Sequence, residues 1–261
     1  MQGTICSSKP GTKKRFLPRI HFPLNRNNKI ESFRIRFDEV FVGFGLFAAM
    51  NLPLASSRPE GVKDALSFLK RMKKKSDLYV GKKVAVLGSG NTAIDAAVVA
   101  KQAGAQDVYI VYRRSFNEMP AWKKERDSAL EQSIHFLILS QPLDYVTDNG
   151  RLQGVKIART ELGEPDASGR RRPVIVPNSE YIFPVDYIIE AIGQRIDEET
   201  RQALGKLELD QNGWIRVNEH FQTSIENVFA GGDIINGGTT AVQAVAEGMR
   251  AAVAMHEQLM V

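Results

Sequence analysis

The chain has 261 residues, of which 43% are hydrophobic and 25% are charged, a composition typical of a soluble globular protein. Its single cysteine, Cys6, excludes an internal disulfide, a cysteine-based metal site and a Cys-x-x-Cys redox pair. The four histidines show no spacing typical of metal ligands, and no apolar stretch approaches the length of a transmembrane helix. We therefore predict a cytoplasmic protein with no metal site and no membrane partner. Any redox chemistry must then use a bound organic cofactor.

The net charge of +5 is unevenly distributed along the chain. Residues 1–36 contain nine lysines and arginines but only one glutamate, whereas the remainder is slightly acidic. Because the basicity is confined to this segment, it does not indicate a nucleic-acid partner. The segment lacks clear periodicity, and we expect a poorly ordered basic arm. A targeting peptide, which would also be basic and poor in acidic residues, is the alternative.

The first predicted elements lie between residues 37 and 79. Residues 37–45 end in Gly-Phe-Gly and are typical of a strand that enters a glycine turn. Residues 51–60 contain two prolines and two serines, which indicates a linker. Residues 61–72 then have apolar side chains at helical spacing.

A strand, a glycine turn and a helix follow one another from Val84 onward. Residues 84–87 are all apolar and predict a buried strand, and Gly-x-Gly-x-x-Ala follows at residues 88–93. An alanine-rich helix then continues without a breaker to Gly104. In this context the motif is typical of a dinucleotide site, with the phosphates bound at the start of the helix. The alternative is a plain turn between a strand and a helix.

The residues after the next predicted strand indicate which nucleotide binds. Residues 108–112 are typical of a strand, and Arg113 and Arg114 follow about twenty residues after the glycines. NAD enzymes place an acidic residue there for the ribose 2′-hydroxyl, whereas arginine can bind a 2′-phosphate. Two arginines and no acid favour NADP(H). An ordinary solvated charge pair at a strand end is the alternative.

The stretch after Arg114 predicts a polar helix and then several strands. The predicted strands are residues 134–139, 152–160, 174–176, 181–183 and 185–193. Arg170, Arg171 and Arg172 most simply lie on a solvated ribbon of a hairpin. The last strand ends in Ala-Ile-Gly, a turn that lets a ligand approach the backbone.

A second glycine turn lies near the C-terminus. Residues 227–233 form a short apolar strand that ends in Gly-Gly-Asp, residues 234–238 are expected to form a loop, and a helix begins at Thr239. Asp233 is placed to accept hydrogen bonds from ribityl or ribose hydroxyls, while the start of the helix would polarise an electron-accepting ring. A capped turn without a ligand is the alternative.

In combination these motifs resemble the pyridine-nucleotide:flavin reductases of the glutamate synthase small-subunit type, and the reductase part of dihydropyrimidine dehydrogenase is similar. The resemblance rests on Gly-Ser-Gly-Asn-Thr-Ala-x-Asp at 88–95, Tyr-Arg-Arg at 112–114, Met-Pro at 119–120, Gly-Glu-Pro-Asp at 163–166, Gly-Arg-Arg-Arg at 169–172, Ala-x-Gly at 191–193 and Val-Phe-Ala-Gly-Gly-Asp at 228–233.

This resemblance implies an α/β fold in which a Rossmann-like NAD(P)-binding domain with a β-rich hairpin insertion interrupts an FAD-binding domain. Residues 37–79 would be the end of the first FAD segment and a linker helix, 80–193 the NADPH domain, 194–219 a connection and 220–261 the returning FAD segment. The residues implied to bind NADPH are Gly88, Ser89, Gly90, Asn91, Thr92, Arg113, Arg114, Ala191, Ile192 and Gly193, and those implied to contact FAD are Gly232, Asp233, Thr239, Thr240 and Gln243.

Residues 1–36 depart from the family pattern. The family begins with a cysteine-rich iron–sulfur region and a first Gly-x-Gly-x-x-Gly unit that binds the ADP part of FAD, and neither is present here. The segment is also too short for a β–α–β unit of about thirty residues with its further strands. We therefore expect an incomplete FAD-binding domain, from a protein that has lost half its flavin site or from a truncated copy.

These observations predict an NADPH-dependent flavin oxidoreductase module that passes hydride to FAD and electrons to a partner subunit or iron–sulfur protein. No catalytic side chain is needed, because the work is positioning and cofactor electrostatics. The alternative is a non-catalytic NADPH-binding remnant or regulatory subunit that cannot hold FAD alone, and a homo-oligomer is left open. A short-chain dehydrogenase is disfavoured because none of the tyrosines that follow the glycine motif has a lysine four residues later.

Overall fold

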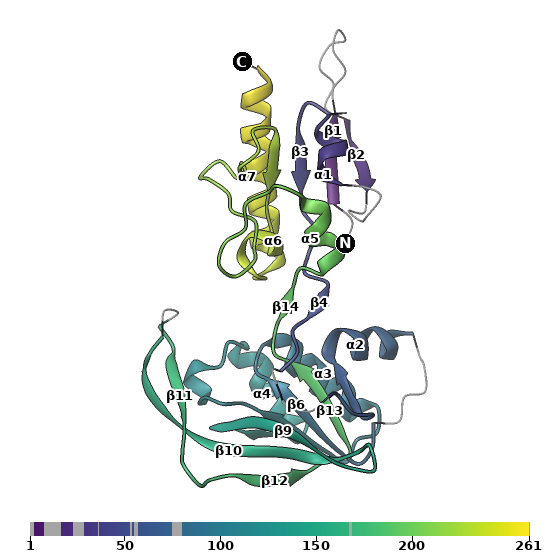
Figure 1. The fold of residues 1–261 in the computed structure, drawn as a ribbon, viewed down its shortest axis with the longest axis vertical. Coiled ribbons are helices and arrows are strands. Elements are labelled where there is room, and N and C mark those ends of the chain that lie inside the picture. The colour runs from purple at the N-terminus through teal and green to yellow at the C-terminus, as the bar shows by residue number, and fades with distance from the viewer. Residues whose placement is uncertain are drawn as a thin grey trace. The chain divides into compact units, whose positions relative to one another are not determined.

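The computed structural model describes residues 3–7, 17–22, 29–35, 37–52, 54, 57–74, 80–166 and 169–260. The chain divides into two compact units, one formed by Met1–Ala48 with Gln194–Val261 and the other by Ala49–Gly193 (Figure 1). The chain passes between them in β4 (Ala48–Ala49) and again at β14 (Gln194–Arg195). Within the described ranges, no helix is long and apolar enough to cross a membrane.

A five-stranded parallel sheet forms the centre of the Ala49–Gly193 unit. Its strands lie in the order β5-β13-β6-β7-β8, and every neighbouring pair is parallel. The strand order reverses between β6 and β13, which makes their carboxyl ends a topological switch point, where open α/β sheets bind ligands. The strands are β5 (Val62–Asp64), β6 (Lys83–Gly88), β7 (Asp107–Val111), β8 (Ile134–Leu137) and β13 (Tyr187–Ala191).

Three helices cover one face of this sheet. They are α2 (Ala65–Lys73), α3 (Asn91–Gln102) and α4 (Lys123–Glu131), and a short 3-10 helix, η1 (Phe116–Glu118), precedes α4. Fully buried alanines of α3 pack directly on the apolar strand residues. Small side chains let the helix approach the sheet closely, which is why the alanine-rich pattern predicts this packing.

A four-stranded antiparallel sheet packs on the other face, as Figure 1 shows for β9, β10 and β12. Its long central strand, β10, pairs with β9 and β12 along its first part and with β11 near its end. The predicted hairpin strands are therefore present, and the sequence analysis missed β9. The strands are β9 (Ser140–Asp148), β10 (Arg151–Pro165), β11 (Arg171–Ile175) and β12 (Tyr181–Pro184).

The other unit is built around two short parallel strands from distant parts of the sequence. The strand β3 (Val40–Val42) pairs in register with β15 (Val228–Ala230). Two further strands, β1 (Gly3–Ser7) and β2 (Leu17–Phe22), form an antiparallel pair. The helices of this unit are α1 (Ile30–Arg34), α5 (Glu198–Leu204), α6 (Asp233–Asn236) and α7 (Ala241–Met260).

Several sequence expectations are corrected in the regions that flank the motifs. The expected poorly ordered arm is wrong for residues 29–35, because α1 buries Ile30 and Phe33 in the core of its unit; most of residues 1–28 lie outside the described ranges. The expected linker, 51–60, and the expected helix, 61–72, belong to the Ala49–Gly193 unit, although part of the linker is not described. The expected connection, 194–219, contains α5, and the expected loop, 234–238, overlaps α6.

Glu39, buried in the core around β3, makes the free energy of unfolding depend on pH. Its side chain is 2% exposed, and neither carboxylate oxygen has a hydrogen-bond partner in the described part of the chain. Burial, together with the neighbouring Asp38 charge, raises the pKa of Glu39 to about 7 from the usual 4.5. The folded state therefore holds this proton more tightly than the unfolded chain does, so the free energy of unfolding falls as the pH rises through that interval.

We expect Glu39→Gln to be more stable than the unmodified chain at about pH 8, by roughly 1–3 kcal/mol, and to lose most of this advantage near pH 5. Urea unfolding at both pH values measures the difference. Glu257→Gln, an exposed change on α7, is the matched control and should give no pH-dependent gain. An equal effect of Glu39→Gln at both pH values would show that the buried charge is not the cause.

Candidate cofactor sites

The carboxyl ends of β6 and β13 meet at Gly88 and Ala191, which are paired in register. Gly88 has a φ of +147°, and a Cβ there would lie 2.7 Å from the carbonyl carbon of Ala191 and closer still to its oxygen. Both the backbone conformation and the close approach therefore require glycine at this position. The predicted tight turn thus lies at the switch point of the sheet.

The start of α3 offers free backbone donors beside open space. Gly90 is the N-cap residue and has no side-chain cap, and a Cβ added to it would meet no atom within 4 Å. The N–H groups of Ala93 and Ile94 donate to the Gly90 carbonyl, at 2.9 and 3.2 Å. Those of Asn91 and Thr92 precede the first intrahelical bonds and can donate to a bound anion.

The loop before α4 holds this turn in place. The N–H of Ala121 donates to the Ser89 carbonyl at 3.1 Å, and the N–H of Trp122 donates to Asn91 Oδ1 at 3.2 Å. Residues 115–118, just before, are fixed by a capping box. Ser89 and Asn91 were predicted to hold the cofactor. In the structure the Ser89 carbonyl and the Asn91 side chain bind this loop, and the N–H groups of both residues are not used in these bonds.

Arg113 and Arg114 have different environments, although they are neighbours in sequence. Arg114 is 5% exposed, donates from Nε to the Arg171 carbonyl at 2.7 Å and forms an ion pair with Asp166 at 2.6 Å. Arg113 is exposed, and its side chain forms no ion pair with the described residues. Both arginines were expected to hold NADPH; in the structure the Arg114 side chain binds the hairpin of β10 and β11, whereas the Arg113 side chain is exposed.

The Ala-Ile-Gly turn after β13 is held by the segment that follows β4. The N–H of Met50 donates to the Gly193 carbonyl at 3.0 Å. Gly193 has a φ of +132°, and a Cβ there would lie 3.2 Å from the Met50 sulfur. Because Ala191 adjoins Gly88, the turn lies at the same edge of the sheet as the start of α3.

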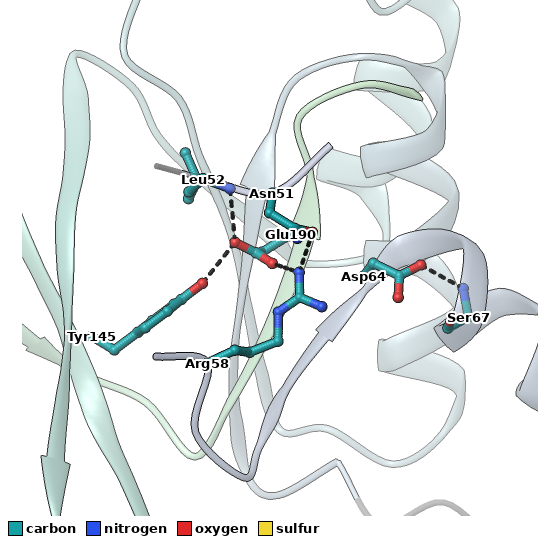
Figure 2. Close-up of polar contacts among 7 residues, drawn as sticks. All are labelled: Asn51, Leu52, Arg58, Asp64, Ser67, Tyr145 and Glu190. Atoms are coloured by element: carbon teal, nitrogen blue, oxygen red, sulfur yellow. Dashed lines mark hydrogen bonds and ion pairs between the residues drawn. The ribbon is translucent and has the colours of Figure 1, made fainter. Parts of the chain in front are cut away.

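A buried ionic cluster, which the sequence analysis missed, precedes this turn (Figure 2). The Glu190 side chain is fully buried and forms an ion pair with Arg58. Its carboxylate also accepts hydrogen bonds from the Tyr145 hydroxyl at 2.7 Å and from the Leu52 N–H at 3.2 Å. Burial and the hydrogen bond to Glu190 raise the pKa of Tyr145, so its hydroxyl stays protonated and donates.

In the other unit, the Gly-Gly-Asp turn is organised by Glu247 of α7. Gly232 has a φ of +78°, and its N–H donates to Glu247 Oε2 at 2.7 Å. The Glu247 side chain also accepts from Gln243 Nε2 at 2.9 Å and from Asn236 Nδ2 at 3.1 Å. Glu247 was not predicted from the sequence, and Gln243, which was expected to contact FAD, binds Glu247 through its amide in the structure.

The Asp233 carboxylate lies among glycines. A Cβ added to Gly45 would lie 3.8 Å from Asp233 Oδ2, and one added to Gly238 would lie 3.8 Å from its Cγ. Thr239 and Thr240 are exposed, and Thr240 Oγ1 accepts a hydrogen bond from the N–H of residue 243 at 3.1 Å. The structure thus places Gly45, which lies in the predicted Gly-Phe-Gly turn at residues 43–45, beside Asp233.

One face of α7 carries exposed apolar side chains. They follow helical spacing and are Val242, Val245, Met249 and Val253, which are 80%, 62%, 67% and 58% exposed. Such a row is larger than the scattered exposure expected of a surface helix. Within the described residues, nothing covers this face.

Comparisons with known proteins agree with the fold and the motifs. The chain is 39% identical over 253 residues to the glutamate synthase [NADPH] small chain of Escherichia coli (strain K12), covering 89% of this chain and 54% of that protein. It is 41% identical over 229 residues to the NADP(+)-dependent formate dehydrogenase subunit beta of Moorella thermoacetica, covering 85% of this chain and 32% of that protein. The chain therefore spans about half, or less, of these relatives.

Among solved structures, FprA from Mycobacterium tuberculosis in complex with NADPH is similar in fold, with a TM-score of 0.73 at 17% identity, covering 88% of this chain and 66% of that one. The predicted α/β fold with a Rossmann-like domain is confirmed, as is the resemblance to the glutamate synthase small-subunit type. The model of the pyridine nucleotide-disulphide oxidoreductases matches residues 19–248. The chain therefore belongs to the pyridine nucleotide-disulphide oxidoreductase family, whose members are NAD(P)H-dependent enzymes.

Proposed function

We propose that the chain is an NADPH-dependent flavin oxidoreductase module, in which the Ala49–Gly193 unit binds NADPH and the other unit contributes to an FAD site. The observation that carries this proposal is the switch point, where a glycine turn, uncapped N–H groups and an exposed arginine occur in one parallel sheet. When bound, NADPH would supply a hydride, and FAD would accept it and release electrons to a further acceptor.

The residues at the switch point fit a dinucleotide. The space at Gly90 lets a pyrophosphate approach the backbone, and the N–H groups of Asn91 and Thr92 can donate to its oxygens at the positive end of the α3 dipole. Arg113 supplies a positive, bidentate donor at the end of β7, where a 2′-phosphate would lie. The two N–H groups and Arg113 all favour anions. No acidic residue follows β7 directly, where it would repel a 2′-phosphate.

The second turn fits the polyhydroxyl part of a flavin. The Asp233 carboxylate can accept hydrogen bonds from ribityl or ribose hydroxyls, and the neighbouring glycines leave its approach open. Thr239 and Thr240, at the start of α7, add hydroxyl and backbone donors. Gln243 would act through Glu247, which fixes the turn, and not by touching the cofactor.

The acceptor of the electrons lies outside this chain in our proposal. A single cysteine can neither form the internal disulfide that the family name implies nor ligate an iron–sulfur cluster by itself. Relatives named as subunits include the NADPH-Fe(3+) oxidoreductase subunit beta of Geobacter sulfurreducens, which is 34% identical over 264 residues. We therefore propose a partner subunit or iron–sulfur protein as the electron acceptor.

The exposed apolar face of α7 favours a second candidate function. If no other part of the protein covers Val242, Val245, Met249 and Val253, the unit that contributes to the FAD site is incomplete. The chain would then bind NADPH without retaining FAD. Such a protein would be a non-catalytic, NADPH-binding remnant or regulatory subunit.

The absorbance spectrum of the purified chain distinguishes these two functions. FAD is added, the excess is removed, and NADPH binding is titrated in parallel by calorimetry. Retained flavin bands together with NADPH binding support the oxidoreductase module. NADPH binding without retained flavin supports the second candidate, and loss of both would contradict the proposed dinucleotide site itself.

A further inference from the structure

Glu190 is an unusual residue for its place in the fold. It lies in β13, between β5 and β6, where Ile188 and Ile189 just before it are fully buried apolar residues. A carboxylate at such a position costs free energy unless it is paired, and an apolar residue would usually make the strand at least as stable. Simple stability of the sheet therefore does not account for Glu190.

The groups that satisfy Glu190 come from two segments, the stretch between β4 and β5 and the strand β9. Leu52 follows β4, Arg58 precedes β5 and Tyr145 lies in β9 (Figure 2). Arg58 also donates to Asn51 Oδ1 at 2.6 Å, so this guanidinium links the two ends of the 51–58 segment as well as binding Glu190. One buried carboxylate thus ties this segment and the antiparallel sheet to the end of β13.

The end of β13 is also the edge of the proposed nucleotide site. Ala191 follows Glu190 directly and packs on Gly88, and the Gly193 carbonyl is bound by the N–H of Met50. The same cluster therefore fixes the two neighbours of the 191–193 turn. One is Glu190, which precedes the turn in β13, and the other is the segment that begins at Met50. A shift of the cluster would move the turn.

The strand order assigns this turn to one half of the dinucleotide. A dinucleotide lies across the switch point, with its pyrophosphate at the start of α3 and its adenosine ribose at the end of the second strand, here β7 with Arg113. Because β13 lies on the opposite side of β6 from β7, the nicotinamide half would extend toward the 191–193 turn.

We propose that Glu190 is a positioning residue for the nicotinamide half of the bound nucleotide. Through Arg58, Tyr145 and the Leu52 N–H, it holds the 191–193 turn and the segment after β4 in the geometry that accepts this half. This inference rests on the proposed NADPH site. It adds that one edge of the site is set by a buried carboxylate that does not touch the ligand.

The test compares a whole dinucleotide with its adenosine part. Dissociation constants for NADPH and for 2′,5′-ADP are measured by calorimetry on the full chain, on Glu190→Gln and on Tyr145→Phe. We expect Glu190→Gln to weaken NADPH about tenfold, the factor that corresponds to loss of one charge-assisted contact, and to leave 2′,5′-ADP unchanged. Tyr145→Phe removes one hydroxyl and should change NADPH in the same direction by less.

Matched variants separate positioning from general damage. Arg58→Ala should reproduce the selective loss of NADPH, and Arg58→Lys should restore part of it, since lysine keeps the charge. Lys156→Met breaks the exposed ion pair with Glu180 on the antiparallel sheet and should alter neither ligand. Equal losses of NADPH and 2′,5′-ADP in Glu190→Gln, or no loss of either, would overturn the positioning role. Failure of the unmodified chain to bind either ligand would instead overturn the proposed function.

Discussion

Gly88→Ala should destabilise the Ala49–Gly193 unit by about 3 kcal/mol or more and abolish NADPH binding. The new Cβ would overlap the backbone carbonyl of Ala191, and neither strand can move away without breaking the in-register pairing of β6 and β13. Alanine would also be forced into a φ of +147°, which L side chains rarely adopt. Urea unfolding measures the stability, and titration measures NADPH binding.

Gly90→Ala is the matched control, because alanine fits both the backbone conformation and the space at this position. Gly90 has a φ of −83°, which alanine adopts easily, and the added methyl group would meet no protein atom within 4 Å. We expect stability to change by less than about 1 kcal/mol while NADPH affinity falls at least about tenfold, since the methyl group occupies the proposed phosphate position. NADPH affinity that survives Gly90→Ala would contradict this placement of the pyrophosphate.

Arg113→Glu should weaken NADPH much more than NADH. A good charge-assisted pair contributes about 1.5–3 kcal/mol, so removal of the arginine alone should cost more than about tenfold, and the new carboxylate would also repel the 2′-phosphate. NADH lacks that phosphate and should lose little. Parallel titrations with both nucleotides give the ratio directly.

Lys63→Glu provides the control for a general charge effect. Lys63 is exposed on β5, the edge strand on the opposite side of the same sheet from β7 and β8, so its reversal changes the net charge equally. It should affect NADPH and NADH alike and only slightly. If Arg113→Glu weakens both nucleotides to the same extent, the assignment of Arg113 to the 2′-phosphate is wrong.

The sequence predicts the switch-point unit well because its signals are local. The apolar run before Gly88, the two glycines and the alanine-rich helix specify one strand, one turn and one helix without distant partners. The C-terminal cap at Gly104, with a φ of +97°, is where the pattern placed it. The family resemblance implied only that the segments containing β3 and β15 belong to one domain, and their parallel pairing was not predicted because the two strands are far apart in sequence.

What the sequence did not predict depends on distant partners or on weak local signals. The strand β9 contains Pro142 and several polar residues, so its pattern is weak, yet it pairs along most of β10. Glu190 is the one charged residue of an apolar strand, whereas Glu247 is one of several polar residues of α7, and the partners of Glu190 lie 45 to 138 residues away. Charge alone gave no sign that they would be buried.

The separate environments of Arg113 and Arg114 were predictable in principle. Adjacent residues at the end of a strand point to opposite sides, so the strand pattern could have indicated that only one arginine faces a ligand, although both were assigned to NADPH. Which one faces it depends on the hairpin of β10 and β11, because Asp166 and the Arg171 carbonyl bind Arg114. That hairpin was predicted, but its position against the end of β7 was not.

The measurement that tests the account most directly is anaerobic mixing of the FAD-loaded chain with NADPH while the flavin absorbance is followed. The account predicts that the flavin bands bleach with NADPH, that NADH at the same concentration is much less effective, and that Gly90→Ala slows the bleaching. Flavin bands that persist in the presence of bound NADPH would contradict hydride transfer within this chain and would leave it as a nucleotide-binding protein.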